Sequence, residues 1–302
     1  MKGSRKIGLV FLAVIAVIGI GLGLVFGFRS TKPRQTKPRI IATTYAVVQI
    51  ADKLDLPLVG VPTTANKIPT RYKNVAKVGN PMNPNVEKIA DLKPTVIYSV
   101  TTLKDQFGKA FSKRHIKPYF LNLTSVKDLE TTVAQMGKRY QRTTQAKTAI
   151  SQINQAKRQA KKIALTHHRR PRVLVLMGLP GAAYMIGTNR SYVGNLVATA
   201  GGRNVFSSSN QEYIQPNDEA IKKANPDVIL RLEHALPKMV TAQFKQAFKT
   251  DPMWSTLSAV KHHRVYDLQE PDFDATANMK AATAIKKVSK WLYPQNGGGS
   301  MR

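Results

Sequence analysis

The sequence predicts an α/β protein with two Rossmann-like lobes joined by a single long helix. Three observations support this class. A helical pattern runs from Ser125 to His168, short β-rich runs alternate with helices on both sides of it, and one helix–proline–strand pattern occurs once on each side. Strands that alternate with helices indicate parallel sheets covered on both faces. A chain of 302 residues also exceeds one typical core, which favours two lobes.

The long helical stretch, residues 125–168, is interpreted as a linker that contains a spine helix. Ser125 and Asp128 have the spacing of a capping box for a first helix, which ends near Gly137. Thr143 or Thr144 is expected to cap a second helix of about 23 residues, or roughly 34 Å. Its small and apolar residues recur at steps of three or four, namely Ala146, Ile150, Ile153, Ala156, Ala160 and Ile163. Its other faces carry Gln, Lys and Arg, so we expect it on a surface.

The N-lobe is expected over residues 39–124. Apolar runs predict strands at residues 39–43, 58–61, 76–78, 95–99 and 117–121, with a helix at 45–54. Residues 79–84 have the composition of a loop. Asn83 is expected to cap a helix that starts at Pro84 and ends near Leu92.

The C-lobe is expected over residues 169–294, followed by a flexible Gly-rich tail at 295–302. Strands are predicted at residues 172–177, 183–186, 228–232 and 264–267, and helices at 192–200, 214–224 and 275–292.

One pattern occurs in both lobes. Glu87 begins a helical segment that ends at Pro94, and a buried-type strand follows at once. Glu219 and Pro226 repeat this spacing, again followed by a buried-type strand. Two similar α/β lobes on one helix are more typical of a two-lobed receptor than of a common enzyme.

Residues 1–28 are predicted to be an N-terminal transmembrane anchor. The stretch from Ile7 to Phe28 is uncharged, follows Lys2, Arg5 and Lys6, and has the length of a bilayer span. No small-x-small cleavage motif follows it, so the anchor is expected to stay. Residues 29–38 form a basic tether. Because basic residues flank the anchor on both sides, the positive-inside rule does not fix its orientation. We expect the folded part outside the cell membrane.

The chain has no cysteine and a formal net charge of +30. The lack of cysteine excludes disulfides, thiolate metal sites, a cysteine nucleophile and a lipidated cysteine. The charge has two interpretations: a nucleic-acid-binding module, or a solvated basic surface near anionic lipid or wall polymer. Lys and Arg are spread along the chain without a zinc-finger or RNA-binding signature, which favours the surface interpretation. No catalytic triad, phosphate loop or acid pair occurs, so no enzyme activity is expected.

Met82 and His234 are the residues with the strongest ligand chemistry. Met82 lies in the proline-flanked loop, and His234 follows the predicted strand at 228–232. Ligands of open α/β sheets bind beyond the carboxyl ends of strands, and a thioether with an imidazole is a known axial pair for haem iron. Spacing alone leaves the alternative open, since single Met and His residues are commonly structural. The pairs at 167–168 and 262–263 are interpreted as surface histidines.

The chain resembles the haem-receptor branch of ABC-transporter substrate-binding proteins, the cobalamin and siderophore type with a rigid helical spine. The likeness is strongest to the haem-binding lipoproteins of iron-regulated surface determinant systems. Gly79-Asn80-Pro81-Met82, together with His234 in its loop, is the specific part of the likeness. Further matching stretches lie at residues 78–84, 99–103, 175–181, 200–206, 210–214, 224–231 and 264–268, within a likeness over residues 39–293. Those lipoproteins carry a lipidated cysteine, which the anchor would replace here.

The resemblance implies a monomeric class III substrate-binding protein that receives haem b, with surface haem-relay proteins upstream, and passes it to an ABC permease. Met82 and His234 would be the axial ligands, and Glu87 and Glu219 would dock onto permease arginines, unless they are ordinary solvated helix charges. Expected haem or propionate contacts beyond strand ends are Thr44, Tyr45, Val61, Pro62, Gly178 and Gly181. Tyr184 would line the pocket or be an ordinary buried aromatic. A receptor for a ferric siderophore or cobalamin remains the alternative on the same fold.

Overall fold

The computed structural model of the chain describes residues 37–113, 117–181, 184–233 and 237–294. Residues from Pro38 onward form one compact unit. The predicted anchor over residues 1–28, nearly all of the tether and the tail at 295–302 lie outside the described residues. Within the described ranges, no helix combines the length and the apolar character that a bilayer span requires.

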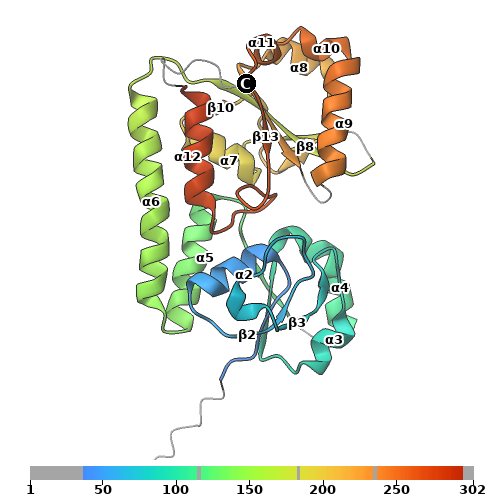
Figure 1. Ribbon diagram of the computed structural model, residues 1–302, viewed down its shortest axis with the longest axis vertical. Helices are drawn as coiled ribbons and strands as arrows, with labels where there is room; N and C mark the ends of the chain where they lie inside the picture. Colours follow the sequence, from blue (N-terminus) through green and yellow to red (C-terminus); the bar gives the residue numbers. More distant parts are fainter. Residues whose placement is uncertain (1–36, 114–116, 182–183, 234–236, 295–302) are drawn as a thin grey trace, which may run out of the picture. The chain divides into compact units, whose positions relative to one another are not determined.

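The N-lobe contains a parallel sheet with helices on both faces, as predicted (Figure 1). Its strand order is β3-β2-β1-β6-β7, and every neighbouring pair is parallel. Helix α2 (Tyr45–Lys53) packs on one face, and α3 (Val86–Asp91) and α4 (Lys104–Lys113) pack on the other. The strands are β1 (Ile40–Ala42), β2 (Leu58–Val61), β3 (Ala76–Lys77), β6 (Val96–Val100) and β7 (Tyr119–Leu121).

Two N-lobe predictions were wrong. The predicted loop at residues 79–84 is a small antiparallel hairpin of β4 (Gly79–Asn80) and β5 (Asn83–Pro84). Because Pro84 belongs to this hairpin, it does not start the next helix. Asn85 caps α3 instead, and its side chain accepts a hydrogen bond from the Lys88 N–H at 2.9 Å. Helix α4 was not predicted. Short 3-10 turns at Thr70–Tyr72 and Thr101–Leu103 complete the lobe.

The C-lobe sheet is mixed, so the expectation of a purely parallel sheet was wrong here. Its order is β11-β9-β8-β12-β13, with β10 also paired to β8. β9 runs antiparallel to β8 and to β11, whereas β12 is parallel to β8 and β13. An antiparallel neighbour needs only a short connection, which residues 179–183 supply. The strands are β8 (Arg172–Gly178), β9 (Tyr184–Gly187), β10 (Arg203–Asn204), β11 (Tyr213–Ile214), β12 (Val228–Glu233) and β13 (Val265–Leu268).

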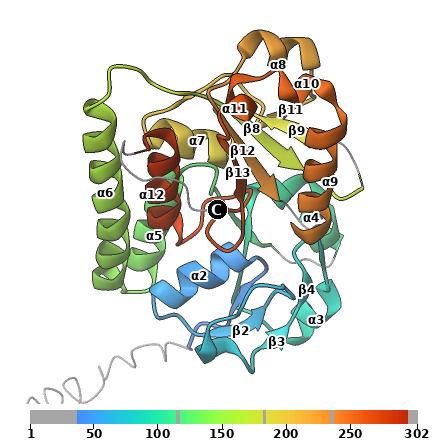
Figure 2. The same ribbon diagram turned by 45° about the horizontal axis from the view of Figure 1, so that its top comes forward.

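Helices cover both faces of this sheet. α7 (Tyr192–Thr199) and α12 (Ala281–Leu292) pack on one face. Figure 2 shows α9 and α10 on the other, where α8 and α11 also pack. These four helices are α8 (Asp218–Ala224), α9 (Pro237–Thr250), α10 (Pro252–Ser255) and α11 (Ser258–Lys261). The predicted helices at 214–224 and 275–292 start too early, because Ile214 belongs to β11 and residues 269–280 form a loop.

The spine consists of α5 (Val126–Arg139) and α6 (Thr143–Leu165), as predicted. Ser125 caps α5 by accepting a hydrogen bond from the Asp128 N–H at 3.0 Å. The threonine cap of α6 was wrong: Arg142 is the N-cap, without a side-chain bond. α6 packs beside α5 and α12 (Figure 1), and the Lys157 ammonium lies 2.9 Å from the buried Glu130 carboxylate on α5. One continuous core runs from the N-lobe through this spine into the C-lobe.

The loop at residues 269–280 adds a second connection between the lobes. The Ala277 N–H donates to the Leu123 carbonyl at 2.7 Å, and the Met279 N–H donates to the buried Gln49 side chain on α2 at 2.9 Å. The Asn66 amide donates to the Glu270 carboxylate at 2.6 Å. The lobes are therefore joined by this loop as well as by the spine.

Candidate functional site

Met82 lies at the turn of the β4–β5 hairpin with its side chain 47% exposed. Its N–H donates to the Asn80 side chain at 2.8 Å, and its carbonyl accepts from the Gln106 amide of α4 at 3.2 Å. Gly79 opens the hairpin at φ +96°, and a Cβ there would lie 2.7 Å from the Asn85 nitrogen. The Gly-Asn-Pro-Met sequence therefore forms a fixed turn that holds a thioether in solvent, where it can reach a ligand.

The hairpin lies at the carboxyl edge of the N-lobe sheet. The Thr63 N–H, just beyond β2, donates to the Gly79 carbonyl at 2.8 Å. Val61 ends β2 and is buried, as is Pro62. The structure thus brings the predicted Val61–Pro62 segment next to the hairpin that carries Met82.

The N-terminus of α2 lies at the same sheet edge, because α2 follows β1 and β1 pairs with β2 in parallel. Thr44 is the N-cap, and its hydroxyl accepts from the Val47 N–H at 3.4 Å. Tyr45 starts the helix, and its hydroxyl donates to the Lys67 carbonyl at 3.0 Å. The first N–H groups of a helix lack intrahelical acceptors, so this edge offers donors and a positive dipole end to an anion.

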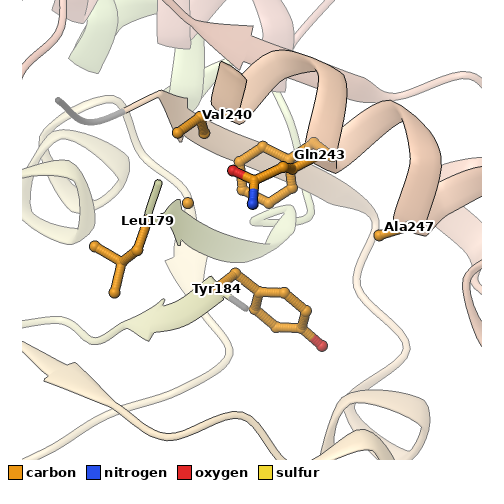
Figure 3. Close-up of a pocket in the computed structure, with 7 residues that line it drawn as sticks. Leu179, Tyr184, Val240, Gln243 and Ala247 are labelled. Atoms are coloured by element: carbon orange, nitrogen blue, oxygen red, sulfur yellow. The ribbon is translucent and has the colours of Figure 1, made fainter. Parts of the chain in front are cut away.

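The C-lobe contains a cavity of about 60 Å³ between the end of β8, the start of β9 and α9 (Figure 3). Gly178 and Tyr184, both predicted contacts, pair across β8 and β9 and both line it. The other lining residues are Leu179, Val240, Gln243, Phe244 and Ala247. The lining is almost entirely apolar. A whole porphyrin is far larger than this cavity, so the cavity suits at most a small apolar group at the edge of a ligand.

Gly178 and Gly181 play different parts. A Cβ on Gly178 would lie 2.3 Å from the Val240 side chain, so Gly178 lets α9 pack closely on β8. Gly181 has φ +70°, and a Cβ there would face open space. When the Gln243 side-chain amide turns its oxygen toward Gly181, that oxygen accepts a hydrogen bond from the Gly181 N–H at 3.2 Å. The amide nitrogen then donates to the Leu179 carbonyl at 3.2 Å. The Gly181 N–H therefore has an acceptor within the protein, which weakens its case as a propionate donor.

Tyr184 is half-buried, and its ring and its hydroxyl have different neighbours. Its ring lines the cavity and packs edge-on against Trp254, with centroids 5.5 Å apart. Its hydroxyl donates to Asp218 at 3.4 Å and points away from Val240 and Gln243 in Figure 3. Burial first, and then the nearby Asp218 charge, raise the pKa of Tyr184. The hydroxyl is therefore directed toward α8 and only the ring faces the cavity.

His234 lies outside the described residues, as do residues 235 and 236. β12 ends at Glu233, which pairs with Gly178, and α9 begins at Pro237. Glu233 is buried; burial raises the pKa of its carboxyl, which accepts a hydrogen bond from the Thr241 hydroxyl at 2.5 Å. The strand end that precedes His234 is therefore held next to the cavity by α9.

An ion pair between the buried Arg231 and the half-buried Asp267 stiffens the same strand. The Arg231 guanidinium makes two hydrogen bonds to Asp267 on β13, at 2.6 and 2.9 Å. Its charge lies 5.3 Å from the Phe244 ring centroid and 4.7 Å from that of Phe248 on α9. Two parallel bonds and two aromatic faces fix β12 relative to both neighbours.

Glu87 and Glu219 occupy equivalent positions. Each is the second residue of its helix, α3 or α8, and each is exposed. The caps match too: the side chains of Asn85 and Asn217 accept from the N–H three residues later, at 2.9 and 2.8 Å. The sequence echo is thus a repeated structural unit that presents a carboxylate on each lobe.

Sequence reasoning missed α9, which supplies most of the cavity wall. A signal was present, since Val240, Phe244 and Phe248 recur at steps of four behind Pro237, a favourable first helical residue. Among the described residues, no group of three or more His, Cys, Asp or Glu side chains could hold a bare metal ion.

Comparisons with known proteins agree with this architecture. The profile of the family described as "Periplasmic binding protein" matches residues 40–271. The high-affinity heme uptake system protein IsdE of Staphylococcus aureus (strain Newman) is 40% identical over 255 residues, which are 84% of this chain and 87% of that protein.

Solved structures give the same result. The crystal structure of S. aureus IsdE complexed with heme superposes with a TM-score of 0.82 at 40% identity, covering 85% of this chain and all of that one. An ABC transporter substrate-binding protein from Listeria monocytogenes EGD-e gives 0.79 at 39% identity, covering 85% and 99%. The periplasmic heme binding protein HutB of Vibrio cholerae, at 18% identity and a TM-score of 0.70, shares the fold.

Proposed function

The chain belongs to the periplasmic binding protein family, and we propose that it is an extracytoplasmic receptor that binds haem and delivers it to an ABC permease for iron uptake. Its 40% identity to S. aureus IsdE over most of both chains carries this proposal. The exposed Met82 thioether, held at the turn of a fixed hairpin, gives it a chemical basis.

Binding would rest on axial coordination and apolar burial. Met82 of the N-lobe and His234 of the C-lobe would ligate the iron from opposite sides. The first N–H groups of α2, beyond Thr44, would donate hydrogen bonds to a propionate, supported by the helix dipole. The cavity beside Gly178 and Tyr184 would receive an apolar edge of the porphyrin. The porphyrin itself would stay chemically unchanged, so the step is reversible binding rather than catalysis.

Release would occur at the permease. Glu87 and Glu219 would pair with permease arginines, one from each lobe, as their matched positions in α3 and α8 suggest. The receptor would act as a monomer that takes haem b from surface relay proteins. Residues 7–28 would anchor it in the cell membrane, with the folded unit outside.

The test is a haem titration of the compact unit, residues 38–302, followed by absorbance. We expect saturable one-to-one binding with a six-coordinate low-spin spectrum. Met82→Ala and His234→Ala should each weaken binding and change the spectrum. Met239 offers a matched control, because it is also a methionine and equally exposed at 47%; Met239→Ala should leave the spectrum unchanged.

Two outcomes would count against the proposal. A featureless spectrum, typical of haem on a basic surface, would favour a ferric siderophore or cobalamin as the ligand of the same fold. An intact spectrum in both ligand variants would show that other residues coordinate the iron.

A further inference from the structure

The last turn of α6 exposes two large apolar side chains. Leu165 is 75% exposed and Ile163 is 38% exposed, whereas the helix buries its residues Ala149, Ile153 and Ala156. Leu165 has the highest exposure of the large hydrophobic residues in the described ranges. Ile163 was expected on the buried stripe, so that expectation was wrong. A single exposed leucine is ordinary, but its surroundings here are not.

Exposed cations surround these two side chains on both sides along the chain. We call this surface the spine tip; its residues are Arg158, Lys161, Lys162, Leu165, His168, Arg169 and Arg170. Ile163 lies two residues before Leu165 and faces another side of the helix. The sequence contains no Asp or Glu between Glu130 and Glu212. Within the described residues, Asp227 is the carboxylate that pairs with this surface, 3.3 Å from Arg169. The spine tip is therefore strongly cationic as well as partly apolar.

Tertiary contacts hold the spine tip in place, so its exposed side chains do not belong to a frayed helix end. The His167 ring packs on Tyr293 with centroids 4.6 Å apart. Arg170 donates to the carbonyls of Gly201 and Gly202 at 3.2 and 2.8 Å. Gly201 contacts Ala164 so closely that a Cβ would lie 2.4 Å from it. The helix end is thus fixed with Leu165 pointing outward.

Two simpler explanations leave part of this surface unexplained. Cations in the last turn complement the helix dipole, and a soluble polyanion would attract them as well. Neither gains anything from a leucine held in solvent. An anionic bilayer surface gains from both features, because its headgroups attract Lys and Arg and its interface takes up apolar side chains.

We infer that the spine tip docks on the surface of an anionic phospholipid bilayer. Arg158, Lys161 and Lys162, which lie on the same side of α6 as Leu165, contact the headgroups together with Arg169, and Leu165 enters the interface. This contact lies on the spine and uses none of the residues proposed for haem or for the permease. A test of this membrane contact can therefore fail without affecting the proposed haem function, and the haem function can fail without affecting this contact.

The test uses residues 38–302, which form a compact unit with a continuous core and lack the predicted anchor. Co-sedimentation is measured with vesicles of phosphatidylglycerol and phosphatidylcholine, and with phosphatidylcholine alone. We expect binding only to the anionic vesicles. The double variant Lys161→Glu/Lys162→Glu should weaken it at least thirtyfold, since each surface cation is worth a factor of about five. Leu165→Gln should weaken it about fivefold through lost interfacial burial.

Matched controls separate the spine tip from the overall charge. Lys222 and Lys223 form another exposed lysine pair in the last turn of a helix, α8, with no exposed large hydrophobic beside them. Lys222→Glu/Lys223→Glu makes the same charge change there and should weaken binding only slightly. Met239→Gln removes a different exposed apolar side chain and should have no effect.

Two results would overturn the inference. The first result would be that the two double lysine variants lose equal amounts of vesicle binding, which would mean that the overall positive charge of the protein, and not the spine tip, attracts it to the vesicles. The second result would be that Leu165→Gln binds the anionic vesicles as tightly as the wild type and that polyphosphate displaces both proteins from the vesicles equally well. It would identify a general polyanion-binding surface instead.

Discussion

Arg39 and Arg172 hold the same position in the two lobes and make the same contacts. Arg39 precedes β1 and donates to the Leu92 carbonyl at 2.7 Å, at the end of α3. Arg172 starts β8 and donates to the Ala224 carbonyl at 3.1 Å, at the end of α8. The residue that follows each carbonyl has a positive φ, 43° at Lys93 and 36° at Asn225. Each arginine thus ties a glutamate-bearing helix to the first strand of its sheet.

Replacing these arginines should cost stability unequally. Arg172 also bonds Asp227, and these bonds outweigh burial and lower the pKa of that carboxyl. We expect Arg172→Ala to lower the free energy of unfolding by about 2 kcal/mol and Arg39→Ala, which is more exposed, by about 1 kcal/mol. Urea unfolding measures both. Arg203→Ala, an exposed control, should stay within about 0.5 kcal/mol of the wild type; equal effects from all three would contradict this assignment.

Gly79→Ala should disrupt the hairpin that carries Met82. The new Cβ would meet backbone atoms of Asn85 and Asn83 at 2.7 and 2.9 Å, in a backbone region that L-residues avoid. We expect a loss of roughly 3 kcal/mol in unfolding free energy and weaker haem binding.

Gly108→Ala is the matched control for this substitution. Gly108 lies inside α4 with open space around its Cα, so an added methyl should stabilise the protein by up to about 1 kcal/mol. A stable Gly79→Ala protein with unchanged haem affinity would show that the hairpin does not position the ligand.

Glu87→Arg and Glu219→Arg should impair docking onto the permease without impairing haem binding. Each reverses an exposed charge at the second position of a short helix, and Glu219 lies in the other lobe from Met82. We expect haem titrations like those of the wild type and at least a tenfold loss in haem-dependent ATPase stimulation of the cognate permease. Asp91→Arg, on the exposed side of α3, is the control and should retain stimulation. Loss of haem binding in either glutamate variant would argue against a docking role.

Asp274→Asn should raise stability more at high pH than at low pH. Burial raises the pKa of Asp274 from 3.8 to about 6, against the effect of the Ala275 N–H. Between these two values the folded state keeps a proton that the unfolded state has lost, so stability falls as pH rises through this window. Melting temperatures at pH 4 and pH 8 test this, and an equal gain at both would contradict it.

Asp272→Asn provides the contrast. Asp272 pairs with Lys287 at 2.7 Å. Removing that pair should lower the melting temperature slightly. Removing the Asp274 charge, which interacts electrostatically with the buried Tyr192 and the half-buried Tyr213, should raise it.

The sequence by itself determined the lobes, the spine and the paired glutamates. These rest on local periodicity and on a repeated spacing, and such patterns fix which face of a helix or strand is buried. The helix from Thr143 to Leu165 and the helix–proline–strand repeats at Glu87 and Glu219 were predicted on this basis. The role of Met82 as a haem ligand comes from the family resemblance of its Gly-Asn-Pro-Met motif and stays a prediction.

Only the tertiary structure decided how the segments pair and what each side chain faces. The hairpin at Gly79 and the antiparallel β9 depend on which strands become neighbours, and no local pattern encodes that choice. The cavity beside Gly178 exists because α9 packs against β8, and Ile163 is partly exposed although it follows the apolar spacing of α6. Contacts between residues far apart in sequence set these features, and local periodicity cannot report such contacts.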